Sequence, residues 1–285
     1  MLKITNVSKT FNKGTINEKK ALRGLNLNLK QGDFATIIGG NGAGKSTMLN
    51  IIAGAYPIDG GTIKIEDVDI SRLPEHLRAK YIGRVFQDPM LGTAAGMEIE
   101  ENLALALRRG KVRSLRWWIK SKEREQYKEV LARLGLGLQD RMNSKVGLLS
   151  GGQRQALTLL MATLVKPKLL LLDEHTAALD PKTAKKVLDL TCEIVSEQNL
   201  TALMVTHNMK DAIAIGNRLI MMHEGRIIYD VEGETKKNLK VSDLLEKFEK
   251  ASGGHFANDR MLPVSYTHLR AHETDSCLVC RLLLE

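Results

Sequence analysis

A glycine-rich string near the start of the chain constrains the fold more than any other feature. It reads Gly39-Gly40-Asn41-Gly42-Ala43-Gly44-Lys45-Ser46-Thr47. A short apolar run at residues 33–38 precedes the string, and residues 45–53 follow it with helical spacing. A strand that ends at glycines and leads into a helix is a unit from which parallel sheets are built. The string therefore predicts a strand, a tight loop and a helix within an α/β fold.

The chemistry of this string indicates a phosphate site. It matches the P-loop pattern of one glycine, four further residues and then Gly-Lys-Ser. The glycines let the backbone turn so that N–H groups of the loop and of the following helix converge on phosphate oxygens. We expect Lys45 to reach the β- and γ-phosphates of ATP, the Ser46 hydroxyl to bind Mg²⁺ and the Thr47 hydroxyl to reach the α-phosphate. The strand before and the helix after disfavour an incidental glycine-rich turn.

Two adjacent carboxylates end a second apolar run. Four leucines at residues 169–172 lead into Asp173 and Glu174. The carboxyl ends of parallel strands share one edge of a sheet, which is also the edge that carries a P-loop. We expect Asp173 to hold Mg²⁺ through water and Glu174 to polarise the water that attacks the γ-phosphate. An isolated Asp-Glu pair is more often a plain strand end, and the upstream P-loop favours the catalytic interpretation.

The remaining segments predict one α/β domain with a helical insertion. Residues 181–198 have helical spacing and residues 201–206 form another apolar run, which favours a mainly parallel sheet. Residues 98–109 and 121–134 have the pattern of amphipathic helices, with no buried strand between them. We therefore expect a helical subdomain over about residues 93–162.

Composition excludes several classes of protein. The net charge is +9, but the basic residues are scattered and aromatic residues make up only 4%, too few for a base-stacking surface. We expect no nucleic acid partner. No run reaches the roughly 18 apolar residues of a membrane span, and the first residues lack the order of a signal peptide. Three cysteines in 285 residues fit a reducing compartment. If the protein serves a membrane, we therefore expect it to do so as a peripheral protein at the cytoplasmic face.

A third string carries a family resemblance. Leu149-Ser150-Gly151-Gly152-Gln153 resembles the signature motif of ABC ATPases without a mismatch. Further landmarks of that family follow its order: Phe11 as the aromatic under adenine, Gln87 of the Q-loop, Asp180 of the D-loop and His207 as the switch histidine. The resemblance covers about residues 1–250. Gly40 and His175 depart from it, since proline is common at both places.

The resemblance implies a fold and a mechanism. The fold is a P-loop NTPase core with a mainly parallel sheet, an antiparallel β subdomain and the inserted helical subdomain. Gln87 would bind Mg²⁺ and report the phosphate state, and His207 would hold the γ-phosphate during hydrolysis. Ser150, Gly151, Gly152, Gln153 and Asp180 would complete the ATP site of a second copy, so that two chains enclose two nucleotides.

The same resemblance implies partners and leaves alternatives open. The partners would be transmembrane permease subunits and, through them, an extracytoplasmic solute-binding protein, with an amino acid or similar small solute as cargo. A non-transport ABC ATPase, such as a cofactor-assembly ATPase, and the ATPase of an exporter are the alternatives.

The end of the sequence has a different character. Residues 251–262 are expected to be a C-terminal extension, and residues 263–285 resemble translated adapter or vector sequence, so we expect a non-native tail there. A zinc or redox module is the alternative for this tail. It would use Cys277, Cys280, His268 and His272.

Overall fold

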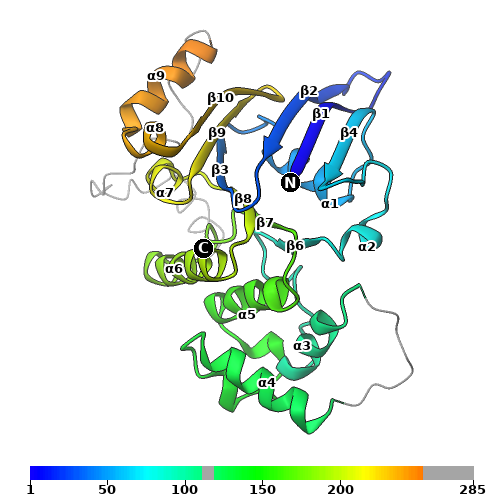
Figure 1. The fold of residues 1–285 in the computed structure, drawn as a ribbon, viewed down its shortest axis with the longest axis vertical. Coiled ribbons are helices and arrows are strands. Elements are labelled where there is room, and N and C mark those ends of the chain that lie inside the picture. Colours follow the sequence, from blue (N-terminus) through cyan, green and yellow to red (C-terminus); the bar gives the residue numbers. More distant parts are fainter. Residues whose placement is uncertain (111–118, 253–285) are drawn as a thin grey trace, which may run out of the picture.

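The structure is a computed structural model that describes residues 1–110 and 119–252. The predicted tail, and nearly all of the predicted extension, lie outside the described residues. The described elements form an α/β core, a second sheet beside it and a helical part below (Figure 1). The predicted fold class is confirmed.

A six-stranded sheet forms the centre of the molecule. Its strand order is β10-β9-β3-β8-β7-β6. All neighbouring strands are parallel except β10, which is antiparallel to β9. The strands are β3 (Phe34–Gly39), β6 (Ile82–Val85), β7 (Leu169–Asp173), β8 (Thr201–Val205), β9 (Arg218–His223) and β10 (Arg226–Glu232). Since β3, β7 and β8 are neighbours, the P-loop and the Asp-Glu pair end at the same edge of the sheet.

Both faces of this sheet are covered, which explains the leucine run of β7. Leu169 and Leu171 belong to one apolar cluster, and Leu170 and Leu172 belong to another on the opposite face. All four side chains are fully buried. Successive side chains of a strand alternate between faces, so a strand that is covered on both sides has to be apolar throughout.

Helices cover the two faces. The first cluster is completed by α1 (Lys45–Ala53), and the second by α5 (Gly151–Leu164) and α6 (Pro181–Glu197), which lie side by side in Figure 1. Near β9, the cover is made by α7 (Met209–Ala214) and α9 (Val241–Ser252), with α8 (Gly233–Lys237) next to them.

The predicted antiparallel β subdomain is a four-stranded sheet of order β2-β1-β4-β5. Its strands are β1 (Leu2–Phe11), β2 (Lys19–Leu29), β4 (Gly60–Ile65) and β5 (Val68–Asp69). Apolar residues of this sheet, such as Leu2 and Ile63, share a cluster with Met48 of α1 and Ile37 of β3. The two sheets therefore enclose α1 in one common core.

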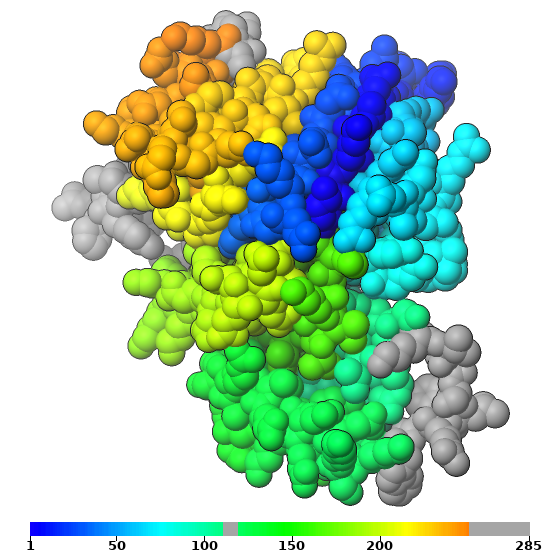
Figure 2. Space-filling view, in the orientation of Figure 1, coloured from blue at the N-terminus to red at the C-terminus, as the bar shows by residue number. Residues whose placement is uncertain are grey.

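The predicted helical subdomain has a small core of its own. It contains α3 (Ile99–Leu107), α4 (Ser121–Ala132) and two short 3₁₀ turns, η1 (Leu138–Asp140) and η2 (Val146–Leu148), which pack against α5. The connection from the second sheet to β6 adds the single-turn helix α2 (Glu75–Arg78). In the space-filling view the helical part forms the lower lobe (Figure 2).

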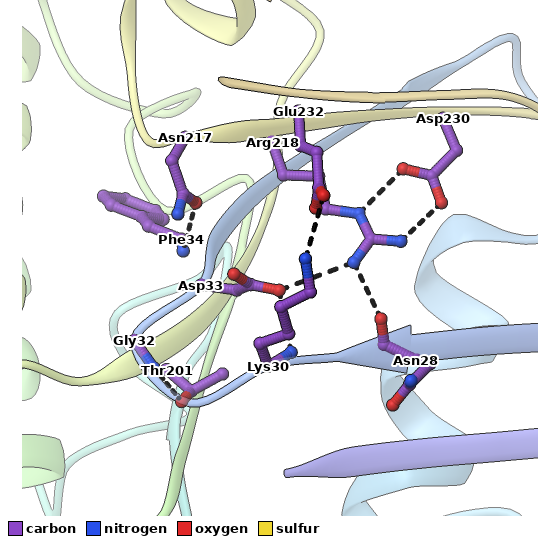
Figure 3. A network of polar contacts seen from close by, with 10 residues as sticks. All are labelled: Asn28, Lys30, Gly32, Asp33, Phe34, Thr201, Asn217, Arg218, Asp230 and Glu232. Carbon is purple, nitrogen blue, oxygen red and sulfur yellow. Dashed lines mark hydrogen bonds and ion pairs between the residues drawn. The ribbon is translucent and has the colours of Figure 1, made fainter.

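A polar network ties the two sheets together at the end of β3 that lies away from the P-loop (Figure 3). Arg218 donates to both carboxylate oxygens of Asp230, at 2.7 and 2.6 Å, and to the Asn28 carbonyl at 2.7 Å. It also lies 3.4 Å from Asp33. Since Asn28 belongs to β2 and Asp230 to β10, a single guanidinium spans both sheets.

Candidate functional site

A cavity of about 310 Å³ lies where the P-loop meets the carboxyl ends of the core strands. Residues of the P-loop and residues that follow β7 and β8 line this cavity together. The lining consists of Phe11, Lys19, Ala21, Asn41, Gly42, Ala43, Gly44, Lys45, Ser46, Thr47, Glu174 and His207.

The P-loop conformation requires its glycine immediately before the helix. Gly44 has a φ of 98° and is the residue at the N-terminus of α1. A Cβ at this position would lie 2.7 Å from the Ala21 carbonyl oxygen, which is closer than atoms in contact allow. The loop is thus pressed against β2, and the free N–H groups of α1 open into the cavity.

Lys45 is held inside the loop. Its ammonium donates to the carbonyls of Gly39 at 2.7 Å and Gly40 at 3.1 Å. The residue is 6% exposed, and this burial lowers the pKa of the ammonium, while Glu174 and Asp173 act in the opposite direction. A cation that is already partly desolvated and fixed by two carbonyls is placed to receive phosphate oxygens.

Asp173 and Glu174 have different surroundings although they are adjacent. Burial raises the pKa of the Asp173 carboxyl. Arg84, at 4.0 Å, and the Ser46 hydroxyl lower this pKa and so act against the effect of burial. Glu174 is 9% exposed and its carboxylate contacts Nε2 of His207. Asp173 therefore faces the hydroxyl expected to bind Mg²⁺, and Glu174 faces the cavity.

The backbone at Glu174 is in an unusual conformation. Its φ is 46°, a left-handed region that non-glycine residues occupy at a cost of about 1–2 kcal/mol. The Glu174 N–H donates to the Val205 carbonyl at 3.1 Å, and its carbonyl accepts from Ala177 at 2.9 Å. These contacts turn the chain so that the carboxylate leaves the strand direction and enters the cavity.

His175, the departure from the family pattern, points away from the cavity. It is 2% exposed, and Nε2 lies 3.0 Å from the Thr191 hydroxyl on α6. That hydroxyl donates its own proton to the Val187 carbonyl at 2.8 Å, so Nε2–H of His175 must be the donor. Burial lowers the pKa of His175 to about 4. The turn after Glu174 is thereby fastened to α6.

Phe11 lies at the end of β1 on the rim of the cavity. The Tyr56 ring packs edge-on against the Phe11 ring, with ring centroids 5.3 Å apart, and this contact holds the Phe11 ring in place. A ring at this place can stack on a nucleotide base. Sequence reasoning missed two lining residues nearby, Lys19 and Ala21. The pairing of Phe11 with Lys19 across β1 and β2 could have suggested the first of them.

The signature residues lie elsewhere. Within the described residues, the cavity lining includes none of the predicted residues Gly39, Gln87, Asp173, Asp180, Ser150, Gly151, Gly152 and Gln153. Ser150 caps α5: its hydroxyl accepts from the Gln153 N–H at 3.3 Å, and the Gln153 side chain accepts from the Ser150 N–H at 3.2 Å. Ser150 and Gly151 are exposed, so this helix start is free to meet another molecule.

Gln87 and Asp180 border the same region of α5 and α6. The residue before Gln87, Phe86, accepts a hydrogen bond from Gln155 of α5 at 3.1 Å through its carbonyl. Asp180 caps α6 by accepting from the Thr183 N–H at 3.0 Å, and the hydrogen bonds from Thr183 lower the pKa of its carboxyl. Both residues therefore belong to segments held by the two helices that cover the sheet.

Comparison with known proteins decides the family. The family model described as ABC transporter matches residues 22–177. A tyrosine transport ATP-binding protein of Clostridioides difficile (strain R20291) is 47% identical over 251 residues, which cover 88% of this chain and 100% of that protein.

This chain belongs to the ABC transporter family.

More distant relatives agree. An aliphatic sulfonates import ATP-binding protein of Agrobacterium fabrum (strain C58 / ATCC 33970) is 33% identical, with 86% of each chain covered. A solved dimeric ATP-binding cassette in a post-hydrolysis state, bound to ADP and Pi, superposes with a TM-score of 0.70 at 32% identity, covering 81% of this chain and 98% of that one. The ABC subunit is therefore an ATPase, and the predictions of family and ATP hydrolysis are confirmed. Across the described residues, no helix is both long and apolar enough to cross a bilayer.

Proposed function

We propose that this ABC ATPase powers the uptake of tyrosine or a related amino acid through separate membrane subunits. The observation that carries the proposal is the 47% identity to a tyrosine transport ATP-binding protein along that protein's whole length. Other relatives are named for methionine and spermidine or putrescine import at 33–37% identity. The higher identity favours the aromatic amino acid within this range of small solutes.

We assign hydrolysis to residues that the cavity brings together. Phosphate oxygens would bind the N–H groups at the start of α1 and the Lys45 ammonium. Glu174 would accept a proton from the attacking water, and His207 would move from the Glu174 carboxylate to the γ-phosphate once nucleotide is present. The contact between these two side chains supports a base that is covered until the nucleotide separates the pair.

The donor set fits magnesium. Ser46 supplies a hydroxyl that lowers the pKa of the neighbouring Asp173 carboxyl, and Mg²⁺ prefers a few such oxygen ligands together with water and phosphate. Gln87, two residues after the end of β6, is the third proposed ligand. The ion would neutralise charge that develops on the β- and γ-phosphates.

We propose that two copies of the chain share their sites. Ser150, Gly151, Gly152 and Gln153 lie outside their own cavity, yet the start of α5 is exposed and has free N–H groups. The solved relative with ADP and Pi is a dimer. In the proposed dimer each signature, together with Asp180, would complete the nucleotide site of the partner copy, and the pair would act on permease subunits served by an extracytoplasmic solute-binding protein at the cell membrane.

The transport proposal is tested by reconstitution. The chain, its co-purifying permease and the solute-binding protein would be placed in proteoliposomes, and ATP hydrolysis measured with tyrosine, phenylalanine, methionine or spermidine. We expect tyrosine to stimulate hydrolysis. Tyrosine should also move from the side of the membrane that holds the solute-binding protein to the side that holds ATP, and accumulate there. Stimulation by methionine or spermidine alone, or failure to join any permease, would contradict the proposal.

The shared site is tested by mixing two inactive variants. Lys45→Ala breaks the P-loop and Ser150→Arg breaks the signature. A heterodimer of the two contains one site with an intact P-loop and an intact signature if the sites are shared between copies, so nucleotide-dependent dimerisation is restored. Sites contained within single chains would give no restoration, because every site would then carry one defect.

A further inference from the structure

Lys19 lines the nucleotide cavity although it belongs to none of the sequence motifs. It is the first residue of β2, and the pairing of the strands sets it directly across from Phe11. The next residue, Lys20, pairs with Thr10 and does not line the cavity. Successive side chains of a strand point to opposite faces, so only one of these two lysines is directed at the site.

The ammonium of Lys19 reaches the P-loop itself. A Cβ built on Gly42 would lie 3.5 Å from Lys19 Nζ. Gly42 belongs to the P-loop, three residues before Lys45, and lines the same cavity as Phe11. The charge of Lys19 therefore lies over the loop backbone that is expected to hold phosphates.

This positive charge has no partner in the parts of the chain that the structure describes. Within residues 1–110 and 119–252, the side chain of Lys19 forms neither a hydrogen bond nor an ion pair, although its backbone is paired with Phe11 in the sheet. Its neighbours differ: Lys45 donates to two P-loop carbonyls, and Lys9 pairs with Asp59 at 3.3 Å. A lysine carries three donors and no acceptor, so an anion that enters the cavity would be the natural partner.

We propose that Lys19 is a second cationic ligand of the nucleotide and binds phosphate oxygens from the side of the cavity where Phe11 lies. This proposal rests on the proposed function, in which the cavity binds a nucleotide. Lys45 would approach the phosphates from inside the loop and Lys19 from outside, so that the phosphate chain lies between two ammonium groups. The contribution of Lys19 then depends on phosphate: it is present for ADP and ATP and absent for adenosine.

The experiment is calorimetric titration of the full chain with ADP and Mg²⁺, since ADP is not hydrolysed. Lys19 is an exposed residue, so for Lys19→Met we expect an affinity about 3- to 10-fold lower, between the effect of an exposed ion pair and that of a hydrogen bond to a charged group. The same substitution at the neighbouring lysine, Lys20→Met, removes an equal charge from the same strand and should change the affinity less than about 2-fold. Lys19→Arg keeps the charge and should retain most of the affinity.

Two further arms separate the possible contacts. Raising the salt concentration should weaken the wild type more than Lys19→Met, because the lost contact is ionic. With 2′-deoxy-ADP the loss caused by Lys19→Met should stay the same. A loss that disappears with the deoxy nucleotide would mean a ribose contact and would overturn the assignment to phosphate.

Failure of this proposal can be told apart from failure of the site assignment. If Lys45→Ala abolishes ADP binding while Lys19→Met binds like the wild type, the cavity is the nucleotide site and Lys19 is not a ligand. Equal losses for Lys19→Met and Lys20→Met would show only a general charge effect and would also overturn the proposal. If Lys45→Ala binds ADP normally, the assignment of the cavity fails, and the role of Lys19 fails with it. Thermal melting checks that the variants are folded.

Discussion

The network around Arg218 predicts a large loss of stability without a loss of nucleotide binding. Arg218→Ala removes a two-pronged contact with Asp230, a bond to the Asn28 carbonyl and the cation beside Asp33. The side chains of Arg218 and Asp33 are 11% and 8% exposed, so water cannot readily replace the guanidinium at Asp33. Asp230 is 33% exposed and can be rehydrated in part.

These exposures set the magnitude. Breaking a buried ion pair costs about 3–5 kcal/mol, and the partial exposure of Asp230 places the expected loss near the lower limit, at about 3 kcal/mol. Arg218→Lys keeps the charge but cannot form the two parallel bonds, and should lose roughly half as much. Lys237→Ala is the control, because the ion pair of Lys237 with Glu234 is 72% and 81% exposed and should contribute nothing measurable.

Urea unfolding followed by far-ultraviolet circular dichroism measures the effect. With a slope of about 2–3 kcal/mol per molar, a loss of about 3 kcal/mol lowers the midpoint by about 1–1.5 M. The network lies at the beginning of β3 and the P-loop at its end, so the affinity for ADP at 20–25 °C should not change. A midpoint equal to that of Lys237→Ala would refute the reasoning, as would a stable protein that no longer binds ADP.

Three other predictions follow from the site and its surroundings. Glu174→Gln should bind ATP and form a stable dimer with almost no hydrolysis, and normal phosphate release would exclude Glu174 as the base. Thr191→Val should lower kcat but hardly change KM for ATP, because the turn after Glu174 loses the hydrogen bond between His175 and the Thr191 hydroxyl. Thr191→Ser keeps the hydroxyl and should behave as the wild type, and equal kcat values in both variants would contradict a positioning role. Burial lowers the pKa of Lys236 to about 8. Between pH 8 and the unfolded pKa near 10.5, the unfolded chain therefore binds a proton that the folded chain has released, and the free energy of unfolding should rise with pH. Urea midpoints measured at pH 7.5 and 9.5 should show this increase in the wild type and not in Lys236→Met.

The elements around the P-loop could be predicted from sequence with accurate bounds. The apolar run at residues 33–38 and the helix at residues 45–53 correspond to β3 and α1 within one residue. The reason is local: glycines that need positive φ and a strand buried on both faces leave few alternatives. The same holds for the leucine run that became β7.

Contacts between distant side chains could not be predicted. The Arg218 guanidinium meets Asn28, 190 residues away in the chain, and His175 meets Thr191 only because α6 folds back over the turn. Neither pair has a pattern of spacing that marks it. Lys19 was missed for a different reason, since a lysine at a strand start is normally a solvated residue and only the closeness of Gly42 gives it meaning.

The roles assigned to individual site residues stay predictions, and so does the division of the chain into domains. What the structure adds is their grouping: the P-loop, Glu174, His207 and Phe11 share one cavity, and the signature faces outward. This grouping is the geometry that a shared site between two copies requires.

The fit between the starts of α5 and α6 limits how ABC subunits can be recombined. A Cβ on Gly152 would lie 2.1 Å from the Thr183 Cγ2, and one on Gly151 would lie 3.4 Å from Leu179. A chimaera that takes the helical part from another parent and returns to this chain after Leu164 would join two surfaces that were never selected together. A crossover placed after Glu197 keeps signature and α6 from one parent, and such hybrids should be the ones that remain active.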